Sequence, residues 1–402
     1  MFLRNLNHHL HLRFFKNKEV DSLYFTSALV NFAGGLNGVF VPIYFWQMGL
    51  PFWQILFYYF LMSLYFIVAA FLFLPILRRL SDKMMMFLGV PFIVLYYVGL
   101  GLVGGTPVLF YLLPAAAAIG SLLFNLGYHI DFNCVADGDC LGREVGMRQT
   151  IDYLVRFSAP ALGGFLISFF GFQNSFFVSV GIFFVAIIPL FFFPKRKMAL
   201  NLTGRSVLGN LFDKKILPFN LSSIGYAMET NVGGIVWPFF VFLTMGDIRS
   251  FGGIISAGLL VGSVVNYLVG YFSDKGDSRK IFTWSTAVFS LIWFVRIFLT
   301  KAWMVAGAHL GADVVYSALL VPWARKYYRV ARQMNDACSF ILSQEILYHL
   351  ARLIFLPGLM LLAYMLPGLA FFRVAFILGA LVTLLFLFAN KIHTGALNVS
   401  KV

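Results

Sequence analysis

Charged residues are scarce in this chain of 402 residues. Aspartate, glutamate, lysine and arginine make up 11% of it, whereas about 25% is usual in a soluble domain. Hydrophobic residues make up 60% of the chain, and 18% of the residues are aromatic. This composition excludes an ordinary soluble domain and indicates a protein that crosses the membrane many times.

Cysteines and catalytic motifs are also scarce. The three cysteines, Cys134, Cys140 and Cys338, fall where we expect the cytoplasm, so no disulfide is expected. The sequence has no phosphate-binding glycine loop, no paired zinc ligands at a useful spacing and no nucleophile elbow. We therefore expect no enzymatic activity, no cofactor and no metal site. A nucleotide-driven pump is disfavoured as well, because no polar region is large enough to hydrolyse nucleotide.

Long apolar runs fill most of the chain. A helix needs about 20 apolar residues to cross the hydrocarbon core of a bilayer. The runs that meet this requirement predict an all-α polytopic membrane protein with twelve transmembrane helices, at residues 22–47, 52–77, 84–103, 107–131, 146–169, 175–194, 218–244, 251–272, 281–300, 302–323, 337–365 and 368–390.

The formal charge of +14 would suggest a nucleic-acid partner in a soluble protein, but its distribution favours the membrane surface. Of the 30 lysines and arginines, 24 lie in the tails and loops of one side, with Arg148 at the very start of its run counted there, and only Arg249 and Lys301 lie in loops of the other. The positive-inside rule then places both termini in the cytoplasm. We expect a monomer in a bacterial-type inner (plasma) membrane, in contact with lipid and not with nucleic acid.

The chain divides into two similar halves. A basic stretch, residues 195–217, separates residues 1–194 from residues 218–402, with six apolar runs in each half. Pro42-Ile43-Tyr44-Phe45 in the first run matches Pro238-Phe239-Phe240-Val241 in the seventh. A charged Ser-Asp-Lys hairpin follows the second run of each half, at residues 81–83 and 273–275. Such repeats are typical of transporters with a site near the midplane between the halves.

The second hairpin resembles a known signature. Gly270-x-x-x-Asp274-Lys275, followed by Arg279-Lys280, is similar to the loop between the second and third helices of each half in the major facilitator superfamily. The resemblance implies two six-helix bundles related by pseudo-twofold symmetry, secondary transport of a small solute by alternating access, and a gating role for the hairpin. The first copy is degenerate: Asp82 is present, but Arg78 takes the glycine position.

The fifth run carries a second resemblance. Gly146, with the segment Ala159-Pro160-Ala161-Leu162-Gly163-Gly164, is similar to the antiporter motif of exporters in this family. The resemblance implies efflux, with a proton as the driving ion, while plain packing of small residues explains the same pattern equally well. A proton-coupled importer of a sugar or metabolite and a transport-inactive membrane scaffold remain open alternatives.

Polar side chains inside the runs supply the candidate substrate or ion site. Charges at the centre of a membrane are costly, so such groups should face the bundle interior. Several pair at helical spacing on one face, with ion pairing between helices as the structural alternative. The candidates are Asn31, Asn37, Asn125, Asp152, Arg156, Glu229, Asn231, His309, Asp313, Glu345, His349 and Arg352; His129 and Asp131 are expected at the membrane interface.

Glu229 is the favoured site for proton coupling. No basic residue of its own run lies within a turn of it, and burial favours the neutral, protonated form of a carboxyl group. Gly233-Gly234 follow closely, so local unwinding is expected there. Arg296 and Arg373, by contrast, lie about a turn from the outer ends of their runs and are expected to extend to the surface as structural anchors.

Overall fold

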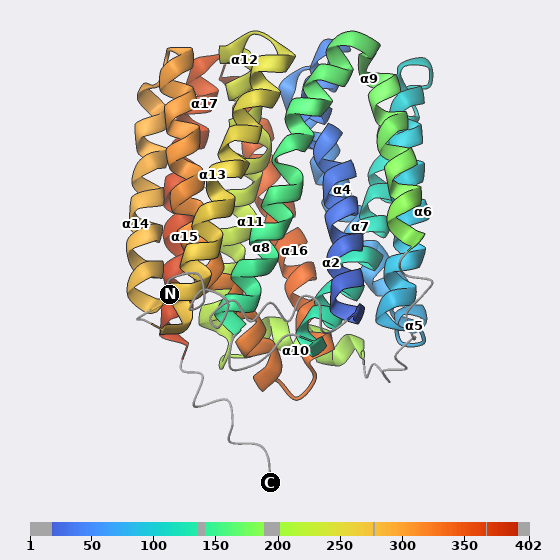
Figure 1. Cartoon of the computed structure of the whole chain (residues 1–402), viewed down its shortest axis with the longest axis vertical. Coiled ribbons are helices and arrows are strands. Elements are labelled where there is room, and N and C mark those ends of the chain that lie inside the picture. Colours follow the sequence, from blue (N-terminus) through green and yellow to red (C-terminus); the bar gives the residue numbers. More distant parts are fainter. Residues whose placement is uncertain (1–17, 136–140, 189–201, 276–277, 367, 393–402) are drawn as a thin grey trace, which may run out of the picture.

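The structure is a computed structural model that describes residues 18–135, 141–188, 202–275, 278–366 and 368–392. Within these residues the chain is helical throughout, without strands (Figure 1). The helices of the first half are α2 (Lys18–Asn37), α3 (Val41–Gln47), α4 (Phe52–Leu72), α5 (Leu74–Leu77), α6 (Asp82–Leu102), α7 (Leu109–Val135), α8 (Leu141–Arg156) and α9 (Ser158–Ile187).

The second half repeats this pattern of long helices and short turns. Its helices are α10 (Gly204–Phe212), α11 (Leu217–Asn231), α12 (Trp237–Met245), α13 (Ile248–Lys275), α14 (Ser278–Val295), α15 (Ala302–Gln333), α16 (Ala337–Met365) and α17 (Leu369–Thr383). A π-helical turn, Val232–Val236, joins α11 to α12, and 3₁₀ segments extend α14 over Arg296–Phe298 and α17 over Leu384–Lys391.

Ten helices in the described residues are long and apolar enough to cross a membrane. One of them, Arg148–Ile187, has 40 residues, which is about 60 Å of helix and twice the bilayer core. Gly171 breaks it with φ +81°, a left-handed value that favours glycine, and α9 turns over at the upper edge of Figure 1. The stretch Leu217–Met245 is not among the ten, because the π turn divides it into short pieces. Twelve spans therefore remain a prediction.

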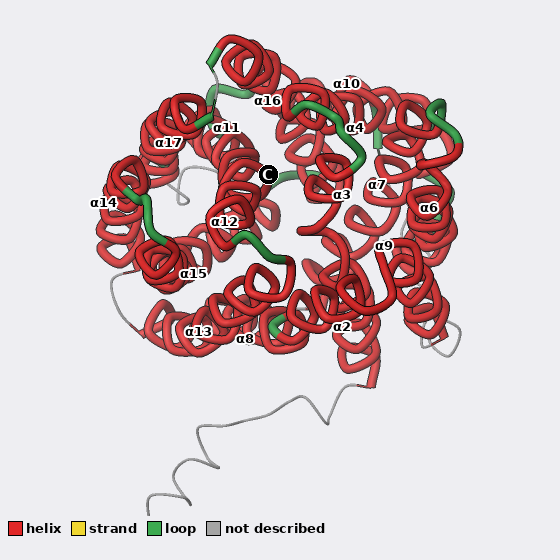
Figure 2. Tube along the Cα trace, turned by 90° about the horizontal axis from the view of Figure 1, so that it is seen from above, coloured by secondary structure: helices red, strands yellow, loops and turns green. Residues whose placement is uncertain are grey.

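Helices from the two ends of the chain gather on opposite sides of the molecule. Figure 2 shows α2, α4, α6, α7 and α9 on one side and α11, α12, α14, α15 and α17 on the other. The two groups meet where α8 packs on α13 and where α4 packs on α16. The boundaries predicted for the two bundles stay a prediction.

Glycines allow close helix crossings, both between the groups and within the first of them. A Cβ added at Gly146 on α8 would lie 2.6 Å from the Cα of Gly270 on α13. One added at Gly163 on α9 would overlap the carbonyl oxygen of Leu36 on α2, and one at Gly252 would overlap that of Pro160. The segment that resembles an exporter motif therefore sits where three helix backbones nearly touch.

The stretch predicted as a linker contains a helix of its own. Thr203 caps α10 by accepting a hydrogen bond from the backbone of Ser206 at 3.0 Å. The side chain of Asn210 donates to Ser343 Oγ on α16 at 3.3 Å, and Asn220 on α11 donates to the carbonyl of Asn210 at 3.0 Å. Residues 204–212 are thus packed against the second half, and are not a simple connector. Cys134 and Cys338 are free thiols, and Cys140 lies outside the described residues.

Candidate functional site

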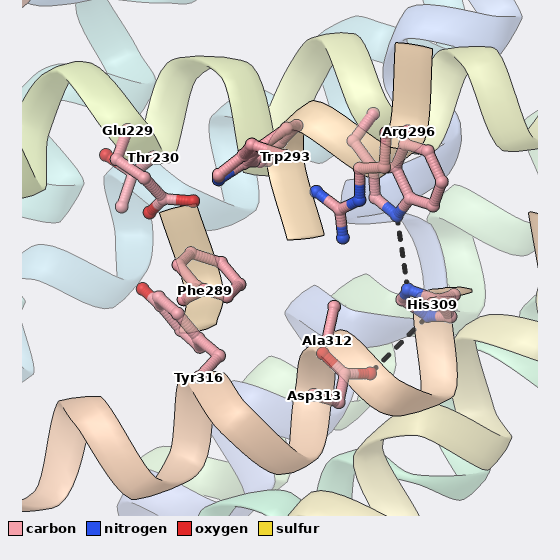
Figure 3. A pocket seen from close by; sticks show the side chains of 12 residues that line it. Glu229, Thr230, Phe289, Trp293, Arg296, His309, Ala312, Asp313 and Tyr316 are labelled. Atoms are coloured by element: carbon pink, nitrogen blue, oxygen red, sulfur yellow. Dashed lines mark hydrogen bonds and ion pairs between the residues drawn. The ribbon is translucent and has the colours of Figure 1, made fainter. Parts of the chain in front are cut away.

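A cavity of about 200 Å³ lies among α11, the π turn, α12, α14 and α15 (Figure 3). The lining side chains come from three segments, residues 229–237, 289–296 and 309–316. Within each segment most of them are spaced three or four residues apart, which places them on one helix face. The lining residues are Glu229, Thr230, Gly233, Gly234, Trp237, Phe289, Trp293, Arg296, His309, Ala312, Asp313 and Tyr316.

The π turn shapes one wall of the cavity. It covers Gly233 and Gly234, where the sequence predicts local unwinding. A Cβ added at Gly233 would lie 2.8 Å from Oε1 of Glu229, so the missing side chain leaves the space that this carboxylate occupies. Glu229 is 2% exposed, and its carboxylate is directed toward the cavity in Figure 3. Helix breaks of this kind are frequent at functional sites, because they free backbone groups and expose side chains.

Arg296 closes the other end of the cavity. Its guanidinium lies 3.8 Å from the ring centroid of Trp237 and 4.0 Å from that of Trp293, so two indole faces hold the cation. The residue is only 3% exposed. The expectation that Arg296 is an anchor at the outer surface is therefore wrong, because the guanidinium turns inward onto the indoles. Arg373, for which the same role was expected, is exposed.

His309 links the two walls at this end. Trp237 Nε1 donates to His309 Nδ1 at 3.2 Å, and His309 Nε2 lies 3.5 Å from Asp313 Oδ2. Because Nδ1 accepts a hydrogen bond, the ring proton belongs on Nε2, which faces the carboxylate. A Cβ at Gly258 on α13 would overlap Asp313 Oδ2, so α13 packs directly against this pair.

A second polar cluster lies between the two helix groups. Asn31 on α2 donates to Asp152 Oδ1 at 3.0 Å, and Asp152 Oδ2 is 3.7 Å from Arg148 Nε. Arg148 also donates to the hydroxyl of Tyr328 on α15. His129 Nδ1 lies 2.7 Å from that hydroxyl, and its Nε2 lies 3.8 Å from Glu345 Oε1 on α16. This polar chain, from Asn31 to Glu345, joins α2, α7 and α8 to α15 and α16.

Comparisons with solved structures identify the architecture. A bacterial homologue of the iron transporter ferroportin, in an outward-facing state, matches with a TM-score of 0.70 and 15% identity over 93% of this chain and 99% of that chain. The fucose:proton symporter FucP of E. coli, a major facilitator superfamily transporter, matches with 0.67 and 13% over 93% and 98%. The human organic anion transporter MFSD10 (TETRAN) matches with 0.68 and 11% over 92% and 98%.

The chain has the major facilitator fold. No protein-family model and no curated protein matches the sequence. At these low identities the structural likeness establishes the fold alone.

Within the facilitator fold, the predicted site residues separate into three sets. Glu229, His309 and Asp313 line the cavity. Asn31, Asp152 and Glu345 belong to the polar chain between the helix groups. The remaining asparagines bond to helix neighbours: Asn125 to Ser121 Oγ at 3.0 Å, Asn231 to the carbonyl of Ala227 at 3.0 Å, and Asn37 to Ser175 and Ser179 on α9.

Among the described residues, two candidate pairs at helical spacing, Asp152 with Arg156 and Glu345 with Arg352, do not form an ion pair. Asp152 approaches Arg148 and not Arg156, one turn in the other direction along the helix. Glu345 approaches His129, whereas Arg352 donates to Thr230 Oγ1 at 3.4 Å. His349, between them, stacks on Phe66 with ring centroids 3.8 Å apart. Asp152 instead has Arg148, one turn earlier on α8, and Asn31 on α2 as partners, whereas Glu345 meets His129 on α7.

The residues of the two predicted hairpins differ in their surroundings. Gly270 forms the close crossing with Gly146, and Asp82 is buried at the start of α6, where its Oδ1 accepts from the backbone of Lys83 at 2.7 Å. Arg279 and Lys280 are exposed at the start of α14. The side chains of Asp274 and Lys275 lie outside the described residues, so the gating role of the hairpin stays a prediction.

Sequence reasoning missed Arg148, Tyr328 and the inward position of Arg296. Arg148 counts as a loop cation by sequence, yet its guanidinium lies 5.0 Å from the ring centroids of both Tyr128 and Phe132. Tyr328 could not be singled out by sequence, because nothing distinguishes it from the other 17 tyrosines of the chain. For Arg296 a signal existed: Trp293 lies three residues before it, at the spacing that puts both on one face.

Proposed function

We propose that this protein is a secondary active transporter that carries a small solute by alternating access, with a proton as the driving ion and Glu229 as the residue that carries it. The observation that supports this most directly is the π-helical break beside Glu229. It opens a cavity with ionisable side chains inside a facilitator fold. Discontinuous helices at the level of the substrate are a general feature of transporters.

The charges around the cavity support proton coupling. Two carboxylates, Glu229 and Asp313, face one guanidinium, that of Arg296, while His309 is neutral in the hydrogen-bonding arrangement described above. One negative charge is therefore left over in a largely dry space, which is unfavourable unless a cation or a proton binds. Asp313 already faces His309 Nε2, so Glu229 is the carboxylate left to take up the proton.

The polar chain between the helix groups supplies the second requirement of alternating access. It joins α7 and α8 to α15 and α16 near the ends that we predict to face the cytoplasm. These contacts form only while the groups are together at that end, so they stabilise one of the two states. The direction that we propose is export, on the resemblance of Gly146 and residues 159–164 to an antiporter motif.

The test is Glu229→Gln in proteoliposomes, with a solute chosen from a thermal-stabilisation screen of the purified protein. The neutral amide keeps the shape and cannot titrate. Accumulation driven by a pH gradient should be lost, while counterflow at saturating solute persists, because counterflow needs no net proton movement.

Accumulation at the pH dependence of the unmodified protein would place the proton elsewhere. Absence of net flux and of counterflow in the unmodified protein would favour the scaffold alternative. Asp313→Asn tests the other carboxylate of the cavity: loss of pH-driven accumulation in this variant, with its retention in Glu229→Gln, would assign the proton to Asp313.

A further inference from the structure

The cavity is acidic at one end and basic at the other. Phe289 and Arg296 lie seven residues apart on α14 and its 3₁₀ extension, which is about 10 Å along the helix. Figure 3 shows Glu229 with Phe289 and Tyr316 at one end, and Arg296 and His309 at the other. Trp237 lies at the second end, because it contacts both Arg296 and His309. The space between them, about 200 Å³, has room for about six water molecules at ~30 Å³ each. A ligand that fills this space meets both charges.

The basic end has hydrogen-bond donors without acceptors. Nε and Nη1 of Arg296 have no hydrogen-bond partner, although the residue is 3% exposed. The indole faces of Trp237 and Trp293 stabilise the positive charge but accept no strong hydrogen bond from these nitrogens. Leaving buried donors unpaired is costly, and the planar fork of a guanidinium matches the two oxygens of a carboxylate. This end is therefore built to receive a carboxylate.

The acidic end has the complementary requirement. In the described part of the chain, no lysine, arginine or histidine forms an ion pair with Glu229. The rings of Phe289 and Tyr316 lie beside it, with centroids 5.1 Å apart. A carboxylate flanked by aromatic rings is suited to an ammonium group, which gains an ion pair and cation–π contacts together. Asp313 does not compete for this role, because it faces His309.

We propose that the solute is a small amphoteric molecule whose carboxylate binds Arg296 and whose ammonium group binds Glu229, with a short aliphatic chain between the two. This inference rests on the proposed function for the meaning of the cavity. The ammonium group and the transported proton exclude one another on Glu229, so binding the solute releases the proton. The other charged or titratable groups near Glu229 are Tyr226 on its own helix α11, Arg296 from the 3₁₀ extension of α14, His309, Asp313 and Tyr316 from α15, and Arg352 from α16, which reaches the adjacent Thr230.

The first experiment uses ligands and leaves the protein unmodified. Affinities of the full-length protein in detergent are measured by calorimetry and by thermal shift for 6-aminohexanoate, hexanoate, hexylamine and hexanamide. 6-Aminohexanoate should bind about ten- to a hundredfold more tightly than hexanoate or hexylamine, because each of these lacks one charge-assisted contact. Glycine, which is too short to span the cavity, should bind no better than acetate. Equal affinities for 6-aminohexanoate and either single-charge ligand, or no binding by 6-aminohexanoate, would overturn the proposal.

The second experiment assigns the two ends. Glu229→Gln should remove the preference for 6-aminohexanoate over hexanoate, whereas Glu345→Gln, on α16 and outside the cavity lining, should retain it. Arg296→Lys keeps a cation between the indoles and should reduce the preference for 6-aminohexanoate over hexylamine. The thermal shift shows whether this variant is folded. A preference that survives Glu229→Gln contradicts the assignment. These binding measurements need no gradient, so they test the ligand proposal separately from the proposed transport function. Binding of 6-aminohexanoate without counterflow would overturn the proposed function and leave the ligand proposal standing.

Discussion

At the scale of single residues, the burial of a polar group says less about its role than its remaining hydrogen-bonding capacity. Asn37 is fully buried, but its amide donates to the carbonyl of Ser175 at 2.9 Å and to Ser179 Oγ at 2.8 Å, and its oxygen accepts from Ser175 Oγ at 2.8 Å. Arg296 is nearly as buried and keeps two nitrogens without partners. Asn37 therefore holds helices together, whereas Arg296 remains able to bind a ligand.

Asn37→Ala should destabilise the protein by about 1–2 kcal/mol, because the serines of α9 lose their partner inside the membrane. The measurement is the free energy of unfolding of the purified protein. Asn125→Ala is the control, since the amide of Asn125 donates only to Ser121 on its own helix, at 3.0 Å, and its loss should cost less. Equal losses in the two variants would mean that the contact between α2 and α9 contributes nothing specific.

At the scale of helices, glycine positions decide where backbones approach. The π turn needs Gly233 so that the Glu229 carboxylate can lie against the backbone. The crossing of α2 and α9 needs Gly163, where a methyl group would meet the carbonyl of Leu36. In contrast, a Cβ at Gly181, on the second limb of α9, meets no atom within 4 Å. The same residue type is thus essential at one position of a helix and dispensable at another.

Gly163→Ala should lower the melting temperature and the folded yield, because α2 has to move away to make room for the methyl group. Gly181→Ala, the matched change in the same helix, should be neutral or slightly stabilising, since alanine favours helix over glycine by about 1 kcal/mol. Both are assessed by thermal unfolding and by the monodisperse fraction in detergent. A tolerated Gly163→Ala would show that the crossing has slack that the structure does not indicate.

At the scale of the whole molecule, the two helix groups touch through chemically different contacts at their two ends. Phe52, at the start of α4, stacks on Phe239 of α12 with centroids 4.4 Å apart, near the predicted outer side. Near the predicted cytoplasmic side the contact is the polar chain through Arg148 and Tyr328. Apolar contacts separate without leaving unpaired charges, whereas the polar chain needs water to replace each partner. Separating the helix groups should therefore require water to enter at the predicted cytoplasmic end and not at the predicted outer end.

The orientation in the membrane is a prediction at this scale. In a version without native cysteines, a cysteine at Thr203, beside α10, should react with an impermeant thiol reagent only from the cytoplasm. A cysteine at Thr106, between α6 and α7, should react only from outside. The reason is the 24-to-2 bias of basic residues between the two sides. Labelling of Thr203 from outside would overturn the predicted topology.

The sequence by itself determined the helical class and the resemblance to the facilitator fold, which the solved structures confirm. It also located the helix break at Gly233-Gly234 and predicted that Glu229, which is 2% exposed, is buried. These features depend on properties that lie along the chain: the length of apolar runs, the spacing of residues on one helix, and the conformational freedom of glycine.

Only the tertiary structure decided which polar groups meet. Asp152 pairs with Arg148 and not Arg156, Glu345 approaches His129 and not Arg352, and Arg296 turns from the surface into a cavity with Glu229. The approach of Glu345 to His129 and the inward turn of Arg296 depend on how neighbouring helices rotate and cross, whereas Arg148 lies one turn before Asp152 on the same helix. Helical spacing fixes only the helix face on which a charged side chain lies. The packing of the helices decides which partner it meets, because leaving a charge unpaired in a membrane interior is costly.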